Sequence, residues 1–66
     1  MIIYDFTTPE LDYFRRICNF TADERTLFDL RAKQTSIERC AEVLGVSVST
    51  AKRISKKVNS KIVRVL

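Results

Sequence analysis

The side chains of this sequence that could do chemistry are mostly cationic, and they gather near the C-terminus. From Ser47 onward the sequence has six basic residues and no acidic one: Lys52, Arg53, Lys56, Lys57, Lys61 and Arg64. Residues 1–34 carry five basic and six acidic residues, whereas residues 35–66 carry seven and two. Such a one-sided excess of positive charge indicates a polyanionic partner, although a basic helix face is also common as a merely solvated surface.

Catalytic and metal chemistry is disfavoured by the rest of the composition. The two cysteines, Cys18 and Cys40, form no CxxC pair, and the sequence contains no histidine that could complete a zinc site. Both fall at apolar positions of helical patterns, so we expect buried, reduced thiols, with a disulfide as the less favoured alternative. With one glycine, no phosphate-binding loop and no evident carboxylate pair, we expect no enzyme activity and no cofactor.

Length and composition indicate one small globular domain. The 66 residues are 45% hydrophobic and 30% charged, which argues against disorder. A domain this short is marginally stable, so good helix packing or a partner subunit would help it. No apolar run approaches the ~18 residues of a membrane span. The start MIIYDF lacks the basic segment and cleavage site of a signal peptide, so a cytoplasmic protein without a membrane partner is expected.

The first half of the sequence predicts two helices. Thr8 is expected to cap a helix with Pro9 in its first turn and an apolar face of Leu11, Phe14, Ile17 and Cys18, ending near Asn19. The second helix is expected to begin at the capping box Thr21-x-x-Glu24 and to fade after Lys33. Its apolar face consists of Leu27, Phe28 and Leu30.

The second half predicts two more helices joined by a tight turn. A second capping box, Thr35-x-x-Glu38, predicts a helix over about residues 36–44, which Gly45 ends. Ser47 is expected to cap the last helix, over about residues 47–60. Its buried stripe is expected to be Ala51, Ile54, Val58 and Ile62, with the basic residues on the opposite face. The predicted fold class is therefore all-α: a small bundle of about four helices.

The last two helices and their turn predict a helix-turn-helix. Ala41 is expected where the two helices approach closely, Gly45 in the turn, and Val46 as a plug beneath it. The start of the last helix then projects outward, as in helices that read base edges in the major groove. The predicted DNA-binding residues are Ser47, Val48, Ser49, Thr50, Lys52, Arg53, Lys56 and Lys57. Lys61 and Arg64 are expected to lie too far along or beyond the helix to reach phosphate.

Residues 20–62 resemble the LuxR/GerE-type helix-turn-helix domain and the related region 4 of bacterial sigma factors. The resemblance is carried by Phe20-Thr21-x-x-Glu24, by the segment from Cys40 to Ser47 (CAEVLGVS), by Thr50-Ala51-Lys52 and by Lys61-Ile62. The sequence departs from the usual pattern at Gln34, where a glycine is frequent, at Ala51 and at Ile54. It has an extra helix before the motif and little room for the C-terminal dimerisation helix of the LuxR/GerE type, which is more like sigma region 4.

Residues 20–66 are thus expected to form a helix-turn-helix DNA-binding domain, preceded by an N-terminal segment and helix over 1–19. The main expectation is a transcriptional regulator that binds double-stranded DNA as a homodimer. Dimer contacts are expected from the apolar run 2–6 or from the tail residues Val63, Val65 and Leu66, although both could instead cover the core. The alternatives are a sigma-region-4-like module that binds RNA polymerase or another protein, and a helical interaction module without a DNA role.

Overall fold

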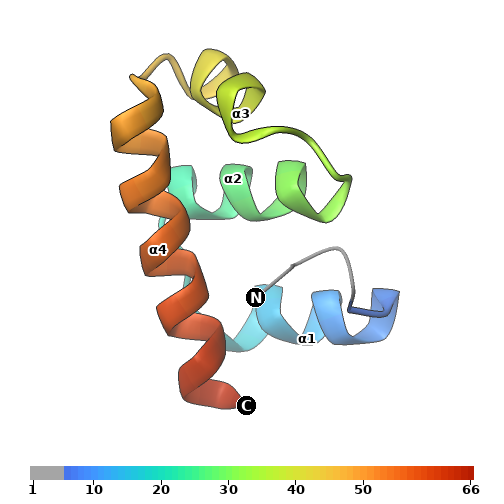
Figure 1. The fold of residues 1–66 in the computed structure, drawn as a ribbon. Helices are drawn as coiled ribbons and strands as arrows, with labels where there is room; N and C mark the ends of the chain where they lie inside the picture. Colours follow the sequence, from blue (N-terminus) through green and yellow to red (C-terminus); the bar gives the residue numbers. More distant parts are fainter. Residues whose placement is uncertain (1–5) are drawn as a thin grey trace.

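The computed structural model describes residues 6–66 and shows a small all-α protein, which confirms the predicted fold class (Figure 1). Three of its helices lie on one side of the fourth, and the fourth contacts each of them (Figure 1). No strand is present among residues 6–66. The helices are α1 (Thr8–Ile17), α2 (Ala22–Ala32), α3 (Ile37–Leu44) and α4 (Val48–Val65).

Two of the four predicted N-caps are correct and two are displaced by one residue. Thr21 caps α2 with the expected capping box, and Ser47 caps α4. The prediction of Thr8 as the cap of α1 is wrong, because Thr7 takes that place: the Glu10 carboxylate accepts from the Thr7 N–H at 2.8 Å. Glu10 lies three residues after Thr7, which is the spacing that a capping box requires.

The cap of α3 is Ser36, so the predicted capping box of Thr35 with Glu38 is wrong. Ser36 Oγ accepts from the Arg39 N–H at 3.2 Å. Thr35 instead completes the end of α2, where its N–H donates to the Leu30 carbonyl at 3.0 Å. Gln34, with a positive φ of 64°, donates to the Arg31 carbonyl at 3.0 Å. These two bonds form a Schellman motif, with a glutamine where glycine is usual.

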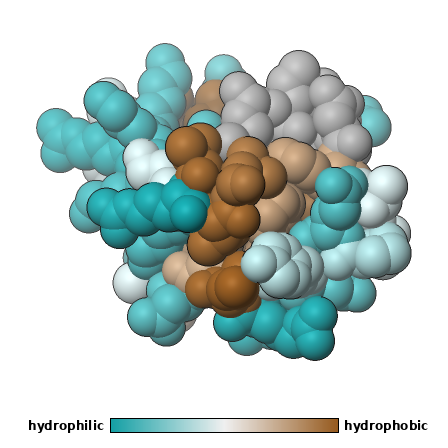
Figure 2. Space-filling model, turned by 90° about the horizontal axis from the view of Figure 1, so that it is seen from below, coloured by the Kyte–Doolittle hydropathy of each residue, from teal (hydrophilic) through white to brown (hydrophobic). Residues whose placement is uncertain are grey.

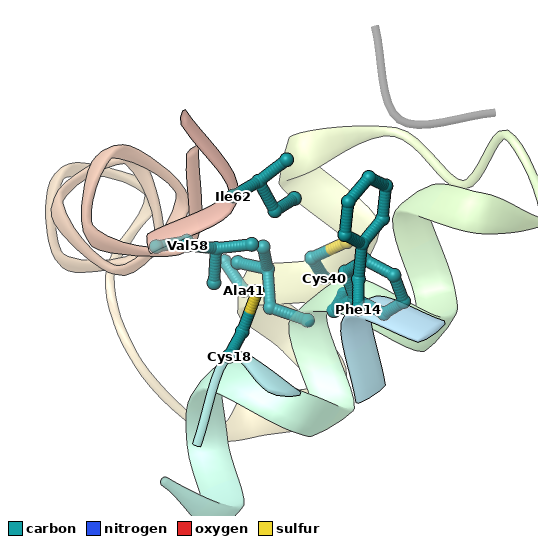
Figure 3. Packing of buried hydrophobic residues seen from close by; sticks show 9 residues of the cluster. Phe14, Cys18, Cys40, Ala41, Val58 and Ile62 are labelled. Atoms are coloured by element: carbon teal, nitrogen blue, oxygen red, sulfur yellow. The ribbon is translucent and has the colours of Figure 1, made fainter. Parts of the chain in front are cut away.

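The core is built from buried side chains of all four helices, several of which are labelled in Figure 3, and Phe28 is the largest of those that are fully buried. Ile17 was predicted on the buried face of α1, but it is 46% exposed. Ile54 is half-buried and packs against the core from its edge. The buried hydrophobic residues are Phe14, Cys18, Leu27, Phe28, Cys40, Ala41, Ala51, Val58 and Ile62.

The two cysteines are free and buried, which confirms the expectation of unpaired core thiols. Burial raises the pKa of both the Cys18 and the Cys40 thiol. The Cys18 thiol also donates to the backbone carbonyl of Lys61, with 3.6 Å between sulfur and oxygen. This contact fixes the end of α1 to the last third of α4.

Arg15 attaches α1 to α2. Its guanidinium donates to Asp29 in α2 at 2.7 Å and to Asp12 in its own helix at 2.6 Å. The same group lies 5.5 Å from the centroid of the Phe28 ring, a cation–π arrangement. Both carboxylates raise the pKa of Arg15, the hydrogen bond to Asp29 most strongly. Arg15 therefore holds α1 to α2, and α1 shares one core with the other three helices.

Candidate nucleic-acid interface

The corner between α3 and α4 has the geometry that the sequence predicts. Gly45 adopts the left-handed conformation at φ 70°, and the Val46 N–H donates to the Ala41 carbonyl at 3.0 Å. Val46 is half-buried against the core, as expected of a plug beneath the turn. Ala41 is 4% exposed and Ala51 is fully buried, so each helix contributes a small side chain to this core. Small residues allow two helix axes to approach closely.

The first turn of α4 begins with a closed hydrogen-bonded cap. Ser47 Oγ accepts from the Thr50 N–H at 3.2 Å and donates to Thr50 Oγ1 at 3.0 Å. Of the predicted site residues, Ser47 and Thr50 therefore cap the N-terminus of α4. Val48 and Ser49 are exposed beside them. The first N–H groups of a helix have no partner within it and form its positive end, so this end suits acceptors or phosphate.

The remaining predicted site residues are all exposed on α4: Lys52, Arg53, Lys56 and Lys57. They lie on the side of the helix that faces away from the buried line of Ala51, Val58 and Ile62. The structure thus exposes six of the eight predicted side chains to solvent along the first three turns of α4. The other two, Ser47 and Thr50, form its cap.

The second half of α4 differs from the prediction. The helix was expected to end near Ser60, but it continues to Val65. Eighteen residues correspond to about 27 Å of α-helix. Ser60 and Arg64 are therefore exposed on the same helix as the predicted site. The signal was present in the sequence, since Lys56, Ser60 and Arg64 are spaced by four residues.

Lys61 has a structural role that the sequence did not reveal. Its ammonium donates to the Glu24 carboxylate at 2.5 Å and to the Asn19 carbonyl at 3.1 Å. Glu24 is 5% exposed and also accepts from the Thr21 N–H at 3.0 Å. Its pKa is lowered chiefly by the hydrogen bond from Lys61, with Lys57 adding a smaller electrostatic effect. These contacts hold the second half of α4 against the start of α2.

The residues that were expected to form dimer contacts are partly packed against the core and partly exposed. Of the run 2–6, only Phe6 belongs to the described residues; its ring packs edge-on against Phe14, with centroids 4.9 Å apart. Val65 packs against the core, whereas Val63 is 59% and Leu66 74% exposed. Viewed from the α1 end, apolar side chains gather on the surface (Figure 2). The homodimer stays a prediction.

In comparisons with known proteins, no family model, no curated protein and no solved structure matches this chain. The resemblance to helix-turn-helix families therefore stands on the motifs alone. Among residues 6–66, no helix is both long enough and apolar enough to cross a membrane.

Proposed function

We propose that this protein binds double-stranded DNA in a sequence-dependent way and acts as a transcriptional regulator. One observation carries the proposal: the α3–turn–α4 corner leaves the start of α4 and its cationic face open to solvent. A helix held in this way fits the major groove, where base edges differ for every base pair. The resemblance to bacterial helix-turn-helix families supports the same function and a cytoplasmic location.

The exposed side chains suit this role chemically. Arginine can donate two hydrogen bonds to a guanine edge, and a valine side chain can contact a thymine methyl group. Val48 in the first turn of α4 and Arg53 in the second are both exposed. Lys52, Lys56 and Lys57 flank them and can contact phosphates, which fix the position of the protein on the duplex.

Fluorescence anisotropy with a labelled duplex of mixed sequence tests DNA binding directly. Three to four phosphate contacts per subunit predict a log–log salt slope of about −3 to −4 for a monomer and roughly twice that for a dimer. If binding is absent at low salt, or flat from about 50 to 200 mM salt, the proposal is wrong. A selection from a random DNA library then tests sequence dependence. Because two-fold proteins read two-fold sites, a palindromic consensus would support the homodimer.

A further inference from the structure

From Arg53 onward, α4 carries a shallow cationic hollow, and the proposed reading of bases uses only one of its lining residues, Arg53. It continues beyond the first turns of the helix, where base edges are expected to be read. Among the described residues it is lined by basic side chains and one serine, and the carbon stems of the basic side chains form much of its wall. The lining residues are Arg53, Lys56, Lys57, Ser60, Lys61 and Arg64.

Four of these residues form a straight line along the helix. Arg53, Lys56, Ser60 and Arg64 are separated by three, four and four positions, which places them on one face of an α-helix. All four are exposed. From first to last they span eleven residues, or about 16 Å along the axis. The helices α1, α2 and α3 all lie on one side of α4 (Figure 1), and the exposure of the four residues shows that these helices do not cover the line.

The charges along this line are not neutralised within the described part of the chain. Arg53, Lys56 and Arg64 have no carboxylate partner among residues 6–66. Lys61 differs, since its ammonium is bound to Glu24 and turned toward α2. The exposed line thus presents three free cations and one hydroxyl group.

We infer that Lys56, Ser60 and Arg64, the part of this line beyond Arg53, form a binding surface for the sugar–phosphate backbone of the DNA whose bases Arg53 and the start of α4 read. The inference rests on the proposed function. DNA is the expected partner because the line offers hydrogen-bond donors and positive charges suited to phosphate. Of the Trp, Tyr and Arg residues that dominate protein interfaces, the line contains only arginine, which also binds phosphate. In consequence, the duplex contacts α4 along much of its length and not only at its first turns.

The salt dependence of binding tests Arg64, the residue farthest from the corner. Arg64→Gln is expected to reduce the magnitude of the log–log salt slope by about 0.9 per subunit and to weaken binding equally for all sequences. Arg16→Gln is the matched control, since it removes one positive charge from an exposed position on α1, beside Asp12 and Arg25. This control is expected to keep the wild-type slope.

A cross-linking experiment tests Ser60 without a change of charge. Both native cysteines are buried, so Ser60→Cys provides the exposed thiol for a photoactivatable azidophenyl reagent. The labelled protein is expected to cross-link to a bound duplex, whereas the same label at Arg16→Cys is not. If circular dichroism shows that Arg64→Gln is unfolded, the cross-linking result at Ser60→Cys alone tests the inference.

The outcomes separate the two proposals. If the wild-type protein does not bind duplex DNA, the proposed function and this inference both fail. If it binds with a steep salt slope but Arg64→Gln keeps that slope, or the label at Ser60→Cys gives no cross-link, only this inference fails. DNA contact would then be confined to the first turns of α4.

Discussion

The Glu24 carboxylate in α2 joins two parts of the protein that are 37 residues apart in sequence, because it accepts a hydrogen bond from the Lys61 ammonium in α4. The same carboxylate accepts from the Thr21 N–H and so completes the cap of α2. One buried side chain therefore caps one helix and fixes the position of another. Since α4 carries the candidate DNA interface, this pair also fixes the direction in which that interface points.

Glu24→Gln is expected to lower the free energy of unfolding by about 1–3 kcal/mol, the cost of leaving a buried hydrogen-bonding group with a poorer partner. The amide oxygen of glutamine can still cap α2, so the loss reports mainly on Lys61. Urea unfolding followed by circular dichroism measures it. Glu42→Gln is the control, because its pair with Arg39 is largely exposed and contributes about 0–1 kcal/mol. Equal losses in the two variants would contradict the structural role of Glu24.

The pH dependence of stability follows from the same pair. The hydrogen bond from Lys61 lowers the pKa of Glu24 in the folded protein below its unfolded value of about 4.3. Near and below that value the unfolded state binds more protons, so the stabilisation is complete above about pH 5 and is lost as the pH falls through the folded pKa. We expect the difference in Tm between wild type and Glu24→Gln to be constant from pH 5 to 7 and to shrink below about pH 4. A difference that stays constant down to pH 3 would contradict this.

The sequence predicts the helices better than their ends, and the two displaced caps show why. Thr7 and Thr8 are adjacent, as are Thr35 and Ser36, and each can accept from a backbone N–H two or three residues ahead. At Thr7 the choice follows from a capping glutamate that the sequence contains. At Ser36 it follows from the end of the preceding helix, since Thr35 is used to close α2. That second reason depends on a neighbouring element and cannot be obtained from local spacing.

The candidate site was predictable where it depends on periodicity, and less so where it depends on contacts between helices. The exposed face of α4 and the buried Ala41 follow from spacing alone. The four-residue spacing of Lys56, Ser60 and Arg64 continues the helical pattern, but the extension of α4 to Val65 was missed because no stop signal marks where the helix ends. Lys61 was expected to be a surface cation because no local pattern links it to Glu24.

Gln34→Gly is expected to stabilise the protein by about 0.5–1 kcal/mol. Gln34 has a φ of 64°, a left-handed conformation that costs a side-chain-bearing residue roughly 1–2 kcal/mol and a glycine nearly nothing. The added flexibility of glycine in the unfolded chain offsets part of this gain. Thermal unfolding measures the change. Lys33→Gly is the control: with φ −92° at position 33, it is expected to destabilise, and stabilisation by both variants would contradict the argument.

Ala41→Leu is expected to destabilise the corner by about 1–3 kcal/mol, since it adds volume to a closely packed core. Ala41 is 4% exposed and belongs to the buried cluster of Figure 3. In a domain this small, such a loss is a large part of a total stability near the low end of ~5–15 kcal/mol. Val43→Leu, on the exposed side of the same helix, is expected to change Tm little. An unchanged Tm for Ala41→Leu would mean that α3 and α4 pack less closely than described.

Arg53→Ala is expected to reduce the preference for a selected DNA sequence more than the affinity for mixed-sequence DNA. A bidentate contact with guanine contributes about 1–3 kcal/mol of discrimination, whereas a phosphate contact contributes equally to all sequences. Lys57→Ala, one turn further along α4, is the comparison: it is expected to weaken binding to both DNAs alike and to reduce the salt slope by about one unit per subunit. Anisotropy titrations of each variant with the selected and the mixed duplex separate the two effects. If Arg53→Ala loses the same factor on both duplexes, Arg53 contacts only phosphate, and base reading must come from Val48, Ser49 or Lys52.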